Sequence, residues 1–253
     1  MNDNRSIAII AAGLVLFLAL GAWWMSRRAE EPAANATPRA VNATEASLDK
    51  AAPVNLPPLN EMDAFLRPLL SALSTRPELA RWLATDDLIR QMASAIDQAS
   101  AGGSPARDLK MLAPAKPFTP ARKGTRRMID PASYRRYDGL VAAITSMDAA
   151  AVAKIYNTIQ PRLNEAYQAM GNRGGNVDDG VSQAIEILLD TPVVNEPIEV
   201  VVGGGAAWAY ADAELEELMA TQKQLVRMGP AHTEALQQWL RAFRSAINES
   251  SRR

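Results

Sequence analysis

The sequence contains no cysteine and a single histidine, His232. Disulfides, thiolate metal sites and cysteine nucleophiles are therefore excluded, and so are metal sites built from several histidines. A Ser-His catalytic triad is disfavoured because only one imidazole is present. The 27 Lys and Arg residues nearly balance the 28 Asp and Glu residues, which gives a net charge of −1. This balance argues against a dedicated nucleic-acid binder, since such domains are strongly basic.

Long uncharged runs are absent except for residues 7–25, which read IAIIAAGLVLFLALGAWWM. A helix of this length spans about 28 Å, close to the hydrocarbon thickness of a bilayer. Trp23 and Trp24 stand at its end, where amphipathic rings favour the headgroup level. The segment therefore predicts a transmembrane anchor after a short amino-terminal tail, residues 1–6. The alternatives are a signal peptide cleaved near residues 19–21 and a buried core helix.

Residues 26–58 are rich in Ala, Pro, Asn, Thr and Glu and poor in large apolar side chains. Five prolines interrupt any helix, so the segment predicts a disordered linker with ends on the order of 30 Å apart. A partly folded arm that docks through residues 54–56 is the alternative. The linker and the absence of cysteine favour an exported carboxyl-terminal domain, although Lys and Arg are nearly balanced around the anchor. The predicted location is the bacterial inner membrane, with one pass and a periplasmic domain.

Helical periodicity begins at Leu59 and predicts a mainly α domain over residues 59–249. Pro161 should kink or split the helix expected over residues 148–170. The one convincing strand signal is Ile198–Val202, followed by three glycines and then Trp208 and Tyr210, which predicts one small β-hairpin. Residues 113–129, with three prolines and one glycine, predict a loop. The expected helix N-caps are Asn60, Thr85, Asp130, Asp212 and Thr221.

A basic stretch stands out because it holds five cations in twelve residues and no acid occurs between Asp108 and Asp130. Its members are Lys116, Arg122, Lys123, Arg126 and Arg127. The functional interpretation is an anion-docking loop for lipid headgroups, an acidic polymer or an acidic protein face. The alternative is a solvated mobile connector. Phe118 is the only aromatic among the five, so a stacking platform for single-stranded nucleic acid is lacking.

Other chemistry-bearing groups have ordinary structural explanations. Gly203–Gly205 lacks the Lys-Ser/Thr of a phosphate loop and predicts a hairpin turn, and His232 is expected to be a solvated residue in the first turn of the last helix. The acidic pairs are Asp86/Asp87, Asp178/Asp179, Glu214/Glu217 and Glu216/Glu217. The first two stand where helices are expected to begin, so capping and dipole effects explain them, and a structural role is the favoured interpretation of the other two as well. No catalytic, cofactor-binding or metal-binding residue is assigned.

Three stretches resemble a family of bacterial single-pass membrane proteins known only as a domain of unknown function. They are residues 56–88 (LPPLNEMDAFLRPLLSALSTRPELARWLATDDL), residues 133–171 (including SYRRYDGL and NEAYQAMG) and residues 222–230 (QKQLVRMGP). The resemblance implies an amino-terminal membrane helix, a Pro-rich tether and a helical carboxyl-terminal domain. It brings no activity, substrate or catalytic residue.

These features predict a membrane-tethered interaction or scaffold module of the cell envelope, with no evident catalytic site and no cofactor. The expected partners are the lipid bilayer and an envelope protein or other acidic partner, and not nucleic acid. The alternatives are a tethered hydrolase that uses two carboxylates and a binder of a small ligand or cell-wall polymer. The sequence supplies neither the pathway nor the oligomeric state.

Overall fold

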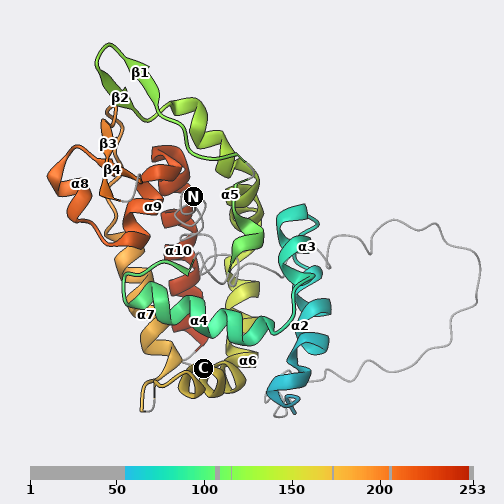
Figure 1. The fold of residues 1–253 in the computed structure, drawn as a ribbon. Helices are drawn as coiled ribbons and strands as arrows, with labels where there is room; N and C mark the ends of the chain where they lie inside the picture. The colour runs from blue at the N-terminus through green and yellow to red at the C-terminus, as the bar shows by residue number, and fades with distance from the viewer. Residues whose placement is uncertain (1–54, 106–108, 115, 173, 205–206, 251–253) are drawn as a thin grey trace, which may run out of the picture.

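The computed structural model describes residues 55–105, 109–114, 116–172, 174–204 and 207–250 (Figure 1). The predicted anchor at residues 7–25 and nearly all of the predicted linker lie outside these residues. Within them, no single helix is long and apolar enough to cross a membrane. The helices at Pro131–Thr145 and Ala149–Ala169, bent by 72°, pass that test of length and composition only as a pair.

Helices make up most of the described chain (Figure 1). The α-helices are α2 (Met62–Ser71), α3 (Pro77–Leu83), α4 (Leu88–Ser100), α5 (Asp138–Thr145), α6 (Ala149–Ala169), α7 (Val177–Leu189), α8 (Ala213–Glu217), α9 (Ala220–Met228) and α10 (Pro230–Ser250). Short 3-10 helices are η3 (Leu59–Glu61), η5 (Lys110–Leu112) and η6 (Pro131–Tyr137). The predicted mainly α fold is confirmed.

Two antiparallel hairpins complete the fold. The predicted hairpin is present as β3 (Val200–Val202) and β4 (Trp208–Tyr210). A second hairpin, β1 (Ala121–Lys123) and β2 (Arg126–Met128), lies inside the segment predicted to be a loop. Gly124 has a φ of 63°, as a tight two-residue hairpin turn with glycine first requires. The strand signal was hidden because Arg and Lys occupy positions where β-branched or aromatic residues are expected.

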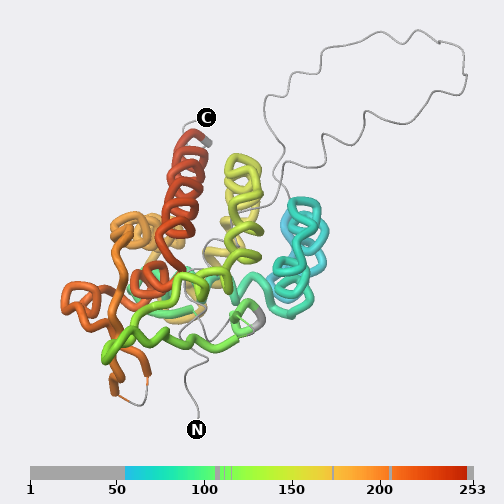
Figure 2. The backbone as a smooth tube through the Cα atoms, turned by 90° about the horizontal axis from the view of Figure 1, so that it is seen from above, coloured from blue at the N-terminus to red at the C-terminus, as the bar shows by residue number. Residues whose placement is uncertain are grey.

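The main core lies between α4, α6, α7 and α10, and Figures 1 and 2 show α6 and α10 side by side. Phe243 of α10 is fully buried there. Its ring stacks on Trp239 at 5.5 Å between centroids and meets Tyr156 of α6 edge-on at 6.2 Å. The indole of Trp239 donates its N–H to the Met147 carbonyl at 2.9 Å, which ties α10 to the turn before α6. Aromatic contacts of this kind fix how the two longest helices pack.

The N-terminus of α4 is capped by a side chain distant in sequence. Thr85 was expected to cap this helix, but α4 begins later, at Leu88, and Asp87 before it has a left-handed φ of 63°. Asp63 of α2 accepts hydrogen bonds from the backbone N–H groups of Asp87 (2.7 Å) and Leu88 (2.8 Å). Arg67, one turn along α2, donates to the Thr85 carbonyl at 2.8 Å. Helix α2 therefore holds the α3–α4 turn in place.

We expect Asp63→Ala to lower the free energy of unfolding by about 1–3 kcal/mol, because two backbone donors lose their acceptor and a helix loses its cap. The measurement is urea denaturation followed by circular dichroism. Asp130→Ala is the matched control, because Asp130 also caps a helix start but accepts only one backbone hydrogen bond, from Ala132 at 2.9 Å. Equal losses in the two variants would contradict the bridging role of Asp63.

Two of the other expected helix caps are confirmed and two are wrong. Asp130 and Asp212 cap as predicted, accepting from the N–H groups of Ala132 (2.9 Å) and Leu215 (3.1 Å). Thr221 does not cap: it is fully buried inside α9, whose N-cap is Met219. Asn60 lies within η3 rather than at the start of α2, and Pro161 does not split α6, which runs unbroken from Ala149 to Ala169. A proline removes only one helical hydrogen bond, and the packing of α6 against α4 and α10 compensates for it.

We expect a fragment starting at residue 56 to fold without the preceding segment, giving a strongly helical circular dichroism spectrum and one cooperative melt. The start is chosen because Arg162 of α6 donates to the carbonyls of Leu56 (3.2 Å) and Pro57 (2.9 Å). A soluble fragment without cooperative melting would contradict the boundary.

Candidate functional site

Four of the five predicted anion contacts come together on the β1–β2 hairpin, which we call the basic hairpin. Arg122, Lys123, Arg126 and Arg127 are all exposed on its two strands. Lys116 is exposed but precedes the strands, and its carbonyl accepts a hydrogen bond from Arg136 at 3.3 Å. The cations are therefore held by a strand ladder rather than by a loop.

Two of the three cross-strand pairs of the basic hairpin are pairs of like charge. Arg122 lies opposite Arg127, and Lys123 lies opposite Arg126. Like charges directly opposite each other destabilise a β-ladder, and an isolated two-stranded hairpin is only marginally stable. The arrangement concentrates four positive charges on a protruding hairpin at a cost to its stability. Successive side chains of a strand point to opposite faces, so the two pairs lie on opposite faces of the hairpin, and an anion bound at each pair would reduce its repulsion.

The two hairpins are joined into one small β layer. Met128 of β2 forms a bridge with Glu199, and the Ile129 N–H donates to the Ile198 carbonyl at 2.8 Å. Two side-chain contacts also cross between the hairpins. The guanidinium of Arg126 lies 3.6 Å from the Glu199 carboxylate, and that of Arg127 lies over the Trp208 ring at 5.4 Å.

A second, smaller hydrophobic core packs against this β layer. Its buried members are Ile129, Ile198, Val200, Tyr210 and Val226, with Phe118, Tyr134 and Trp208 packed against them. Arg227 of α9 is only 8% exposed here. Its guanidinium lies over the rings of Tyr210 (5.3 Å) and Phe118 (6.0 Å) and donates a hydrogen bond to the Trp208 carbonyl. Burial raises the pKa of Tyr210, and the nearby Arg227 charge lowers it by less.

A carboxylate beside Arg227 links β4 to α9. Glu216 accepts hydrogen bonds from the Tyr210 backbone N–H (2.8 Å) and from Lys223 Nζ (2.7 Å). Partial burial raises the pKa of Glu216, but these two hydrogen bonds and the charges of Lys223 and Arg227 lower it by more, so the net pKa is below its usual value. The charged form of Glu216 therefore stabilises the base of the β layer.

We expect Glu216→Gln to lower stability at pH 7 by at most about 1 kcal/mol, since the side chain is partly exposed. The folded-state pKa is depressed, so the stabilisation is complete above the unfolded-state value of about 4.3 and is lost as pH falls through the folded-state pKa. The difference between parent and variant should thus shrink below pH 4.3. Urea denaturation at pH 7, 5, 4 and 3 measures it, and a difference that stays constant would show that charge is not involved.

Two of the stretches that carry the family resemblance meet beside this layer. Gly229 has a φ of 93°, and a side chain there would lie 2.5 Å from the ring of Tyr134. The Gln224 amide donates to the Tyr137 hydroxyl at 3.0 Å. His232 was expected to be solvated, which is wrong: its side chain is 19% exposed and its Nε2 lies 3.0 Å from an Asp138 carboxylate oxygen. The stretches at residues 133–140 and 222–230 thus form one packed junction.

Several members of the carboxylate pairs make structural contacts, although the side chains of Asp86 and Asp87 do not cap α4 as expected. Asp86 pairs with Arg67 at 3.1 Å and Asp87 with Arg90 at 2.5 Å, beside an open groove of about 860 Å³ near α2. Asp178 accepts from the Tyr156 hydroxyl and from the Gln160 amide, which ties α6 to α7. Within the described residues, no three His, Asp or Glu side chains are arranged to hold a metal ion.

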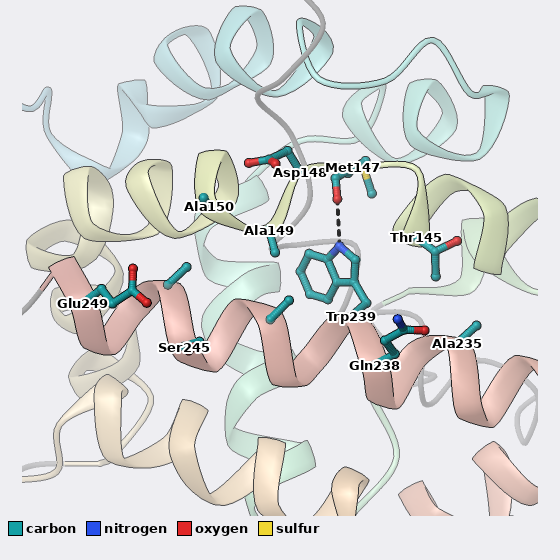
Figure 3. A pocket seen from close by; sticks show the side chains of 12 residues that line it. Thr145, Met147, Asp148, Ala149, Ala150, Ala235, Gln238, Trp239, Ser245 and Glu249 are labelled. Atoms are coloured by element: carbon teal, nitrogen blue, oxygen red, sulfur yellow. Dashed lines mark hydrogen bonds between the residues drawn. The ribbon is translucent and has the colours of Figure 1, made fainter.

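A second open groove, of about 690 Å³, runs between α10 and the start of α6 (Figure 3). Alanines and Trp239 line much of it, and its two acids are Asp148 and Glu249. Figure 3 shows these two carboxylates well apart, and Asp148 caps α6 by accepting from the Ala151 N–H at 2.8 Å. The groove therefore does not bring a pair of carboxylates together.

Sequence reasoning missed the residues that position the basic hairpin, chiefly Arg227, Arg136 and Trp208. Arg136 lies over the rings of Phe118 (5.5 Å) and Tyr137 (5.1 Å), so arginine–aromatic stacking recurs around the second core. A signal existed, because both arginines lie in the stretches SYRRYDGL and QKQLVRMGP. Neither stretch alone shows that the other folds against it.

The described residues define a mainly helical protein that carries a small β layer with a cationic hairpin. The chain belongs to the family described as "Protein of unknown function (DUF3014)", whose sequence profile matches residues 88–244. The match includes the basic hairpin and Arg227 and leaves α2 and α3 outside it. No curated protein and no solved structure matches the chain.

Proposed function

We propose that this protein is a membrane-tethered interaction module of the cell envelope, which docks an anionic partner through the basic hairpin. The observation that carries the proposal is the presence of two like-charge cross-strand pairs, Arg122 opposite Arg127 and Lys123 opposite Arg126, on an exposed hairpin. Folding alone does not favour this choice, because like charges at these positions weaken the ladder.

The surroundings of the hairpin support a docking role. Glu199 lies 3.6 Å from Arg126 and is the one acid in ion-pair contact with the four cations among the described residues. Among the described residues no acid forms an ion pair with Arg122, Lys123 or Arg127, so their charges are available to an anionic partner. The uncharged segment at residues 7–25 and the Pro-rich segment after it would hold the domain close to a bilayer.

The test of docking uses the full chain in nanodiscs of neutral lipid and a soluble polyanion, heparin, as the probe. Replacing Arg122, Lys123, Arg126 and Arg127 with Ser should weaken binding roughly 10- to 100-fold at low salt and leave the melting temperature nearly unchanged. The matched control removes four exposed cations that lie outside the β layer, with Ser at Arg76, Lys154, Arg241 and Arg244. Equal losses in both variants would show that net charge, not the hairpin, attracts the polyanion.

The test of topology uses alkaline phosphatase and green fluorescent protein fused in turn to the carboxyl end. Phosphatase activity without fluorescence is the expected result for a domain outside the cytoplasm. Fluorescence without phosphatase activity would overturn this part of the proposal, and release of the chain by carbonate would overturn the anchor.

A further inference from the structure

Large exposed apolar side chains are rare on the described surface, and two of them stand beside the basic hairpin. Among the described residues they are Met170 (40%), Val201 (43%), Val202 (67%) and Met219 (48%). Val201 and Val202 are consecutive and form the outer end of β3. Trp208, half-buried, lies directly opposite Val202 on β4. The outer end of this hairpin therefore presents an apolar tip of two valines and an indole.

The apolar tip and the turn of the basic hairpin lie on the same side of the bridge between the two hairpins. Strands β2 and β3 are antiparallel at the Met128–Glu199 bridge. At this bridge β2 runs away from its own hairpin turn and β3 runs toward its turn, so the two turns lie on the same side of the bridge. The Arg127 guanidinium stacked on Trp208 links the two features directly.

We propose that the outer end of the β layer binds the surface of a membrane rich in anionic phospholipids. Val201 and Val202 enter the interface, Trp208 lies at the level of the headgroups, and the four cations of the basic hairpin pair with lipid phosphates. This inference rests on the proposed anion-docking function and names the partner. The linker predicted from the sequence at residues 26–58 would make this contact possible, since a flexible segment of that length spans on the order of 30 Å.

A lipid surface fits these observations better than an acidic protein does. A stable protein interface buries about 800 Å² on each partner around a central anchor, and two valines at the end of a hairpin supply neither the area nor the pocket. Binding to an anionic bilayer needs no shape match, because each Lys or Arg near the surface and each inserted apolar side chain contributes separately. Trp is also enriched at membrane interfaces.

The acids near the layer set its orientation on the membrane. Glu199 pairs with Met128 at the end of the layer opposite the hairpin turns, and its carboxylate reaches Arg126 at 3.6 Å. Helix α8 beside β4 carries Glu214 and Glu217, both exposed, and is preceded by Asp212. Glu216 of the same helix bonds the backbone of Tyr210 at the inner end of β4. These carboxylates would be repelled by lipid phosphates, so the layer approaches with its hairpin turns first.

The test exploits the absence of cysteine in the chain. A single cysteine introduced by Val202→Cys carries an environment-sensitive fluorophore, and the full chain is placed in nanodiscs of neutral lipid or of neutral lipid with phosphatidylglycerol. The reference position is Gln183→Cys on the exposed face of α7. The expected result is a blue-shifted emission, quenched by spin-labelled lipid, at position 202 in anionic nanodiscs only. Position 183 should show neither effect in either lipid.

Charge variants then separate the contributions. Ser at the four cations of the basic hairpin should lower the ratio of docked to undocked protein on the order of 100- to 1,000-fold at low salt. Raising the salt concentration should also lower this ratio for the parent protein, because salt screens the charges. Gln at Glu214 and Glu217 is the control and should leave docking unchanged or strengthen it.

The outcomes distinguish this inference from the proposed function. A solvent-exposed probe at position 202 on anionic nanodiscs, together with hairpin-dependent heparin binding, would overturn the membrane inference and leave anion docking standing with a soluble acidic partner. Loss of both signals would overturn both proposals. Insertion that persists in the fourfold Ser variant would show that the apolar tip acts without the cations, which also contradicts the inference.

Discussion

Gly229→Ala is expected to lower the free energy of unfolding by about 2–6 kcal/mol, a large share of the stability of an ordinary domain. Gly229 separates α9 from α10 with φ 93° and ψ 160°, a region that only glycine occupies readily. A Cβ built there lies 2.5 Å from Cγ and 2.6 Å from Cδ2 of Tyr134. Backbone strain and the displaced ring therefore add, since the tyrosine packs against the second core and cannot simply rotate into water.

Gly124→Ala is the matched control for this substitution. Gly124 also has a positive φ, 63°, but no atom lies within 4 Å of a Cβ built there. We expect a loss of about 1 kcal/mol, from backbone strain alone. Urea denaturation of the fragment starting at residue 56 measures both variants. If the two alanines cost the same, the close approach of Tyr134 to Gly229 does not matter for stability.

The helical part of the fold was predictable because its causes are local. Apolar spacing predicted most of the helices, and the short side chains of Asp130 and Asp212 marked helix starts without any tertiary information. The start of α4 was mispredicted because its cap, Asp63, lies on another helix, 24 residues away along the chain from Asp87. A cap supplied across the fold leaves no signal in the residues next to the helix it serves.

The candidate site was predictable in charge but not in shape. Composition alone identified Arg122, Lys123, Arg126 and Arg127, and it grouped Lys116 with them. The hairpin that displays the four was missed because Arg and Lys stand where β-branched or aromatic residues mark a strand, and because the bridge that supports it joins Met128 to Glu199, 71 positions away. Strand propensity is set by neighbours across the sheet more than by the strand itself, so an arginine-rich strand is recognised only once its partner strand is known.

Phe243→Ala is the second substitution with a large expected effect, about 3–5 kcal/mol. The Phe243 side chain is fully buried and lies where α10 meets α6, stacked on Trp239 and edge-on to Tyr156. Removing the ring leaves a cavity that two large aromatic neighbours, one of them held by its hydrogen bond to the Met147 carbonyl, cannot fill by small shifts. The loss should appear in urea denaturation as a lower midpoint with an unchanged slope.

Two further variants show whether the cavity is the cause. Phe243→Leu keeps most of the volume and should cost less than about 1.5 kcal/mol. Phe65→Ala on α2 removes the same atoms from a partly buried site at the edge of the core, so its loss should be less than half that of Phe243→Ala. If Phe65→Ala costs as much as Phe243→Ala, the contact between α6 and α10 is not the main support of the core, and α2 contributes more to stability than its edge position indicates.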